Sequence, residues 1–121
     1  MAPLRFTENS MATVKYEPVS APGSGSVLVV WRDLSSGDEG EPFVPAGSCL
    51  VQMTGDFGGA VSLEGTLDPK GSAWFGLTDH DNLAIVKTSP DGEVVREQVY
   101  MVRPKAGAGV RNVTVWLYVP A

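Results

Sequence analysis

Few side chains of this sequence could carry out chemistry, and most of them lie in one short polar segment. His80 is the only histidine, and Asp79, Asp81 and Asn82 flank it. Oxygen ligands of this kind would suit calcium or magnesium. The same residues are also typical of a tight turn, because Asp and Asn side chains bond to the nearby backbone. We favour the turn, and we predict no metal site, no catalytic site and no cofactor.

The other reactive group is Cys49, the single cysteine of the chain. One cysteine excludes an internal disulfide and a zinc site built from cysteines. Cys49 lies in the apolar run SCLVQM, which is typical of a buried, unreactive thiol. A nucleophile paired with a histidine could use only His80. We therefore predict that the protein is not an enzyme.

Charge and hydropathy exclude further classes of partner. The formal net charge is −5, and the nine Lys and Arg residues form no cluster. Binding to a phosphate backbone depends on grouped cations, so we expect no nucleic-acid partner. No apolar run approaches the roughly 20 residues that a membrane-spanning helix needs. The N-terminal residues contain no hydrophobic segment of signal-peptide length. We therefore expect no membrane partner.

Short alternating segments must position whatever site the chain has. In NVTVWLYV, Val113, Val115, Leu117 and Val119 fall on one face of a strand, and Trp116 and Tyr118 fall on the other. No segment has the apolar spacing of an amphipathic helix. The pattern predicts strands over Thr13–Val19, Ser26–Leu34, Cys49–Thr54, Ala60–Thr66, Ala73–Leu77, Leu83–Thr88, Val94–Arg103 and Asn112–Val119.

This pattern predicts an all-β fold, an antiparallel β-sandwich with a jelly roll of about eight strands. Asp91-Gly92 is the best candidate for a two-residue hairpin turn. The proline-rich segment Ser35–Ser48 is predicted to be a loop, which Phe43 and Val44 could tether. Residues 11–121 are expected to form a single domain. Residues 1–10 are expected to be a flexible extension or an arm that orders against a neighbouring subunit.

Aromatic and apolar residues are the candidates for binding a partner. Trp74 is expected in the core, whereas Trp116 and Tyr118 would be outward if the aliphatic face of their strand is the core. Exposed aromatic residues in a row suggest a protein or sugar surface, although the same strand could instead be covered on both faces. The candidate partner-binding residues are Leu4, Phe6, Trp31, Phe43, Trp116 and Tyr118.

Three segments together resemble a family of small structural proteins encoded near the capsid gene of tailed phages. They are EGTLDPKGSAWFGLTD, EVVREQVYMVRPKAG and VTVWLYV. The matching positions are Glu64-Gly65-Thr66, Asp68, Trp74, Leu77, Arg103-Pro104 and Val113-Thr114-Val115. Two positions depart from the pattern: DPKGSAW replaces a tighter Asp-Gly turn, and Met101 stands where a tyrosine is expected. The similarity extends from about Met11 to Val119.

The resemblance implies a capsid cement (decoration) protein, which binds the outer surface of an assembled head and joins neighbouring capsid subunits. It implies the major capsid protein as partner, self-association as a dimer or trimer, and a place on the outside of the virion after synthesis in the host cytoplasm. Two alternatives stay open. One is a carbohydrate-binding β-sandwich, and the other is a head–tail or tail structural protein of a phage.

Overall fold

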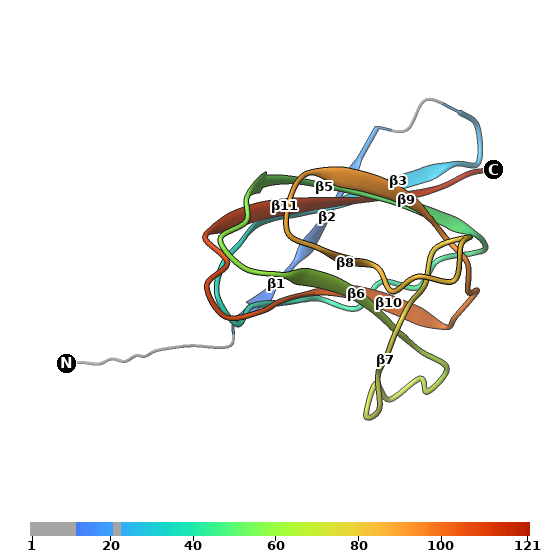
Figure 1. The fold of residues 1–121 in the computed structure, drawn as a ribbon. Coiled ribbons are helices and arrows are strands. Elements are labelled where there is room, and N and C mark those ends of the chain that lie inside the picture. Colours follow the sequence, from blue (N-terminus) through green and yellow to red (C-terminus); the bar gives the residue numbers. More distant parts are fainter. Residues whose placement is uncertain (1–11, 21–22) are drawn as a thin grey trace.

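The fold consists of two β-sheets that pack face to face (Figure 1). The computed structural model describes residues 12–20 and 23–121, and these residues form eleven strands and no helix. No helix long and apolar enough to cross a membrane therefore occurs in the described part of the chain. The predicted all-β sandwich is confirmed, with short extra strands beyond the eight expected.

One layer, sheet A, has the strand order β1-β4-β10-β6-β7, with β8 also paired to β6. β1 and β4 run parallel, and the other pairs run antiparallel. The strands of sheet A are β1 (Thr13–Val14), β4 (Glu39–Gly40), β6 (Val61–Thr66), β7 (Phe75–Gly76), β8 (Val86–Lys87) and β10 (Met101–Ala106).

The other layer, sheet B, has the order β2-β3-β11-β5-β9, and all of its strands are antiparallel. The central strand, β11, has the strongest alternation in the sequence. Neighbouring strands occupy both of its edges, but one of its faces still points toward the core and the other points outward. The strands of sheet B are β2 (Tyr16–Val19), β3 (Val27–Leu34), β5 (Cys49–Asp56), β9 (Asp91–Val95) and β11 (Asn112–Val119).

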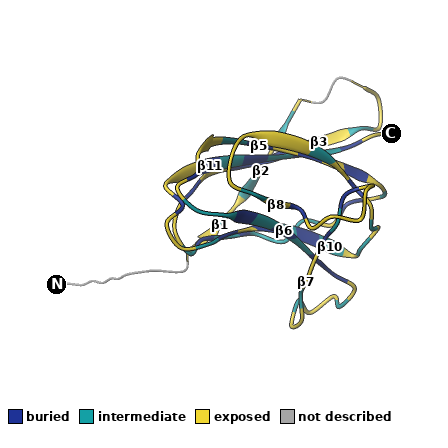
Figure 2. Cartoon of the chain, in the orientation of Figure 1, coloured by how far each residue is buried: buried dark blue, intermediate teal, exposed yellow. Residues whose placement is uncertain are grey.

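The core lies between the sheets (Figure 2), and most of its side chains are aliphatic, with Trp31 and Phe57 among them. Val113, Val115, Leu117 and Val119 are all buried, as the alternation of β11 predicts. A bulge interrupts the β3–β11 ladder, where Arg32 and Asp33 both lie opposite Thr114. Asp33 has a φ of 59°, and its backbone N–H donates to Thr114 Oγ1. The bulge therefore restores the inward direction of Leu34.

The predicted strand Val94–Arg103 is in fact two strands in different sheets. β9 ends at Val95 in sheet B, and β10 begins at Met101 in sheet A. Residues 96–100 cross between the layers, held by the N–H of Arg96 on Thr78 O and the N–H of Tyr100 on Thr66 O. Residues 96–100 contain no Gly or Pro, so the sequence gives no signal that one strand ends and another begins. Asp91-Gly92 begins β9 and is not the predicted hairpin turn.

The predicted loop Ser35–Ser48 contains the short strand β4 and is tied to sheet A. Phe43 and Val102 exchange backbone hydrogen bonds of 2.9 and 2.8 Å, so Phe43 tethers the segment as expected. Val44 remains 52% exposed and does not serve as a tether. Gly40 permits close packing here, since a Cβ at this position would lie 2.8 Å from Trp31 Cδ1.

Candidate functional site: two outer faces

An apolar row crosses the whole outer face of sheet B. The row is Val19, Leu28, Tyr118, Leu50 and Val94, one residue from each strand, paired in register from β2 to β9. The outer face of a two-layer sandwich usually carries polar residues in alternation. Leu50 and Val94 are nevertheless 41% and 45% exposed. A continuous apolar row of this kind is a candidate contact surface.

The neighbouring row of sheet B brings Trp116 between two very different residues. Val30 lies on one side and Gln52 on the other. Val30 is fully buried although it does not belong to the core cluster, so residues of the outer face cover it. The guanidinium of Arg32 lies 5.6 Å from the Trp116 ring centroid and donates to Glu17 Oε1 at 3.2 Å. The Trp116 indole is thus partly covered by the Arg32 side chain.

A groove of about 440 Å³ opens where this second row ends at Gly92. Gly92 lies opposite Gln52 and has no side chain to continue the row, so the surface is hollow between β5, β9 and β11. Its lining is mainly aliphatic and aromatic, with three polar side chains. The lining residues are Leu28, Leu50, Val51, Gln52, His80, Gly92, Glu93, Val94, Trp116 and Tyr118.

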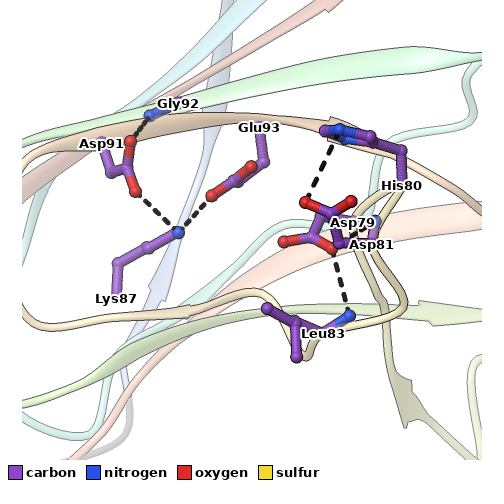
Figure 3. A network of polar contacts seen from close by, with 8 residues as sticks. All are labelled: Asp79, His80, Asp81, Leu83, Lys87, Asp91, Gly92 and Glu93. Atoms are coloured by element: carbon purple, nitrogen blue, oxygen red, sulfur yellow. Dashed lines mark hydrogen bonds and ion pairs between the residues drawn. The ribbon is translucent and has the colours of Figure 1, made fainter.

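The turn that carries His80 forms one rim of this groove. Asp79 Oδ1 accepts hydrogen bonds from the N–H groups of Asp81 and Leu83, and Asn82 has a φ of 64° (Figure 3). These bonds are those of the predicted turn. His80 itself is exposed, and its Nε2 lies 3.7 Å from Asp81 Oδ2. The structure therefore uses the polar segment to build a turn beside β9.

An ion-pair cluster closes the edge of the sandwich next to the groove. Lys87 Nζ, from sheet A, lies 2.8 Å from Asp91 Oδ2 and 2.5 Å from Glu93 Oε2, both from β9 (Figure 3). Hydrogen bonds to Asp91 and then to Glu93 raise the pKa of Lys87, and the bond to Lys87 lowers the pKa of Asp91. The negative charge of Glu93 is therefore compensated within the protein.

The outer face of sheet A carries charged side chains that pair with one another. Arg103 donates to Glu64 Oε1 at 3.1 Å and to Glu39 Oε1 at 3.3 Å, and its guanidinium lies 4.0 Å from the Trp74 ring centroid. Trp74 is half-buried on this outer face, so its expected place in the core is wrong. Glu64, Trp74 and Arg103, which belong to the family-like pattern, thus form one structural cluster.

This cluster anchors the segment between β6 and β7, which projects from sheet A (Figure 1). Asp68 accepts bonds from the N–H groups of Lys70 and Ser72 and from the Ser72 hydroxyl, and these bonds lower its pKa, with the Ser72 hydroxyl the largest cause. Trp74 Nε1 donates to Gly71 O at 2.8 Å. We call residues 67–75 the projection.

The projection begins and ends in exposed apolar side chains. Leu67 is 70% exposed and Phe75 is 45% exposed. Tyr100, also 45% exposed, is bonded through its backbone to Thr66, next to Leu67. A pinned segment with apolar residues in water is a second candidate contact surface.

The predicted partner-binding residues lie in different environments in the structure. Trp116 and Tyr118 are outward and line the groove. Trp31 is fully buried, and its Nε1 donates to Glu41 O, so it is a core residue and the prediction of a surface role is corrected. Phe43 is half-buried with its ring 5.2 Å from that of Tyr16. Leu4 and Phe6 lie outside the described residues.

The groove contains residues that the sequence interpretation did not select. Leu50 and Gln52 alternate with the buried Cys49, Val51 and Met53, and this period of two could have placed them on the outer face. No local pattern could have placed Gly92 at the groove, because its position there depends on pairing with Gln52, 40 residues earlier in the chain.

The remaining reactive groups are the buried Cys49 and the acidic side chains of the described residues. No group of three or more His, Cys, Asp and Glu side chains there could hold a metal ion. Cys49 is buried, and burial raises the pKa of its thiol to about 11. The nucleophile is therefore protonated near neutral pH.

Comparison with known proteins identifies the fold. No protein-family model matches the chain, and no curated protein matches it. A solved cupin domain from Bordetella pertussis Tohama I is similar in structure, with a TM-score of 0.51 and 16% identical residues. The match covers 92% of this chain and 99% of that one. At this identity the match is one of fold, and the chain is a jelly-roll β-sandwich.

Proposed function

We propose that this protein is a non-enzymatic cement protein that binds the outer surface of an assembled phage head and joins neighbouring capsid subunits. The observation that carries the proposal is the pinned apolar projection on sheet A. It is built by Asp68, Trp74 and Arg103, which are among the residues that resemble the cement-protein pattern. The pattern and the candidate contact surface therefore coincide.

The projection has the physical properties of a docking element. Leu67 and Phe75 offer apolar area that is wet in the free protein, and burying such area contributes roughly 25 cal/mol per Å². The bonds to Asp68 hold the segment in place before contact. A pre-ordered segment loses less conformational entropy on binding than a mobile one.

Cementing follows from thermodynamic linkage. A protein that binds the assembled shell and not its free subunits stabilises the shell by its binding free energy at each occupied site. The chain needs no catalytic group for this role. Its net charge of −5 favours solubility of the free protein, while the apolar projection provides the adhesive contact.

The direct experiment mixes purified protein with undecorated heads of its phage and measures occupancy and the temperature of shell rupture. We expect saturable binding and a higher rupture temperature. Leu67→Glu should abolish both effects, because a carboxylate would be desolvated in the contact. Leu83→Glu, at a 63% exposed position in the turn beside β9, is the matched control and should bind normally. Heads that neither bind the protein nor gain stability would contradict the proposal.

Self-association belongs to the same proposal. Copies joined as a dimer or trimer at a symmetry axis would bind with a high effective local concentration. Sedimentation of the free protein, together with imaging of the decorated particle, tests this part. A protein that is monomeric both in solution and on the head would contradict it.

A further inference from the structure

We infer that the groove on sheet B is a binding site for a neutral saccharide. This goes beyond the proposed cement function and uses the opposite layer of the sandwich. The projection belongs to sheet A, whereas Trp116, Tyr118 and Gly92 belong to the outer face of sheet B. A copy docked through its projection would leave this groove facing away from the shell.

The shape of the groove suits a small, partly apolar ligand. Its volume of about 440 Å³ lies within the range of roughly 300–1,000 Å³ that is typical of small-molecule sites. The hollow exists because Gly92 carries no side chain beside Gln52. The ligand would therefore lie in the space where a larger residue would continue the row.

The aromatic residues provide platforms for stacking. Trp116 and Tyr118 are two residues apart on β11, so they share one face at a separation of roughly 7 Å along the strand. Aromatic faces carry partial negative charge, and the C–H groups on one face of a sugar ring are complementary to them.

Polar groups at the groove are available for hydroxyl groups. Trp31 and Trp74 both donate their indole N–H to backbone carbonyls. Within residues 12–20 and 23–121 no acceptor lies in hydrogen-bond range of the Trp116 indole, and the Gln52 amide and Tyr118 hydroxyl likewise have no protein partner there. Small numbers of such groups around an apolar lining give orientation and specificity to a ligand site.

Charge complementarity selects an uncharged ligand. Glu93 is the only Asp, Glu, Lys or Arg among the lining residues, and Lys87 neutralises it. Arg32, behind Trp116, is paired with Glu17. An anionic or cationic ligand would lose hydration without finding an unpaired countercharge. A neutral sugar meets the apolar, hydroxyl-binding and charge requirements together.

The test titrates the protein with uncharged linear hexasaccharides of glucose, galactose, mannose and N-acetylglucosamine, and with sulfated forms of the same chains. Binding is followed by tryptophan fluorescence and by ligand-observed NMR. We expect at least one neutral chain to bind, and its sulfated form to bind at least about tenfold more weakly.

Gly92→Leu should weaken that binding at least about tenfold by filling the hollow. The backbone tolerates the change, since a Cβ at position 92 would lie 3.4 Å from its nearest neighbour, an ordinary contact. Gly76→Leu is the matched control, because nothing lies within 4 Å of a Cβ at that position in sheet A. If Gly92→Leu fails to fold, Trp116→Ala is used in its place, with the same expected loss.

The outcomes separate this site from the proposed docking surface. Gly92→Leu should lose saccharide binding and keep head binding, whereas Leu67→Glu should do the reverse. Loss of head binding in Gly92→Leu would make the groove a shell contact and overturn the inference. Absence of binding by every neutral chain at millimolar concentration would also overturn it, as would saccharide binding that Gly92→Leu leaves unchanged.

Discussion

Each outer face of the sandwich has an arginine beside a tryptophan and paired with a glutamate, but the two groups differ in burial. On sheet A, Arg103 lies 4.0 Å from the Trp74 centroid, and its side chain is 15% exposed. On sheet B, Arg32 lies 5.6 Å from the Trp116 centroid, and its side chain is 47% exposed. The difference decides what each tryptophan can do.

In the tighter group the aromatic ring is part of the scaffold. Trp74 is held by Arg103 and by its own bond to Gly71 O, and it fixes the base of the projection. In the looser group the ring of Trp116 lines a groove. The same three residue types thus support structure on one face and lie beside an open groove on the other.

The largest expected effect is that of Arg103→Met. The change leaves the Glu39 and Glu64 carboxylates, which are 26% and 19% exposed, without their main cation. We expect a loss of about 2–3 kcal/mol in the free energy of unfolding, measured with urea. Arg32→Met on sheet B should cost less than about 1 kcal/mol, because that pair is largely exposed. Equal losses would contradict the contrast between the faces.

Trp116→Ala is expected to have an intermediate effect. The side chain is only half-buried, but it helps to cover Val30, so we expect a loss of about 1–2 kcal/mol, less than the roughly 3–5 kcal/mol of a core tryptophan. The variant should remain folded by circular dichroism. A variant that unfolds would place Trp116 among the structural residues, like Trp74.

Acid should loosen the projection. The pKa of Asp68 is lowered from 3.8, so its stabilising effect is complete above pH 3.8 and is lost as the pH falls through the lower value of the folded state. We expect faster amide hydrogen exchange in residues 70–72 as the pH is lowered toward 2, after correction for intrinsic rates. Asp68→Asn removes the titrating group, so it should show no such acid-dependent change. A response unchanged in Asp68→Asn would assign the effect to other groups.

The smallest effects are expected at the exposed apolar residues themselves. Leu67→Ser should change the free energy of unfolding by less than about 0.5 kcal/mol, since Leu67 is 70% exposed. Leu50→Ser should cost less than about 1 kcal/mol, since Leu50 is 41% exposed and loses part of its buried apolar area. Thermal unfolding of the two variants beside the unmodified protein measures this. A loss above about 2 kcal/mol in either would show that the residue supports the fold and is not kept for contact.

The sequence predicted the elements whose pattern is local. β11 and β6 have aliphatic residues at a period of two, and the structure turns these residues inward as expected. Between Val95 and Met101 the chain crosses from one sheet to the other. No Gly or Pro in this segment marks the crossing. The prediction of one strand there failed for this reason.

The candidate site was only partly predictable because it depends on register. Alternation identified Trp116 and Tyr118 as outward, but Trp31 has the same local surroundings of valine and was placed wrongly. The apolar row joins Leu28, Tyr118 and Leu50, which come from three strands far apart in the sequence. The strand order decides which residues become neighbours, and the local sequence pattern does not reveal the strand order.

The buried thiol of Cys49 makes the protein convenient for site-specific labelling. With a pKa of about 11, the thiol is ionised in only about one molecule in ten thousand at pH 7, and its neighbours shield it from reagents. A cysteine introduced at an exposed position such as Ser89 would be the one group that maleimides modify readily. A fluorophore, spin label or cross-linker could thus be attached to a defined point of the chain without first removing a native cysteine.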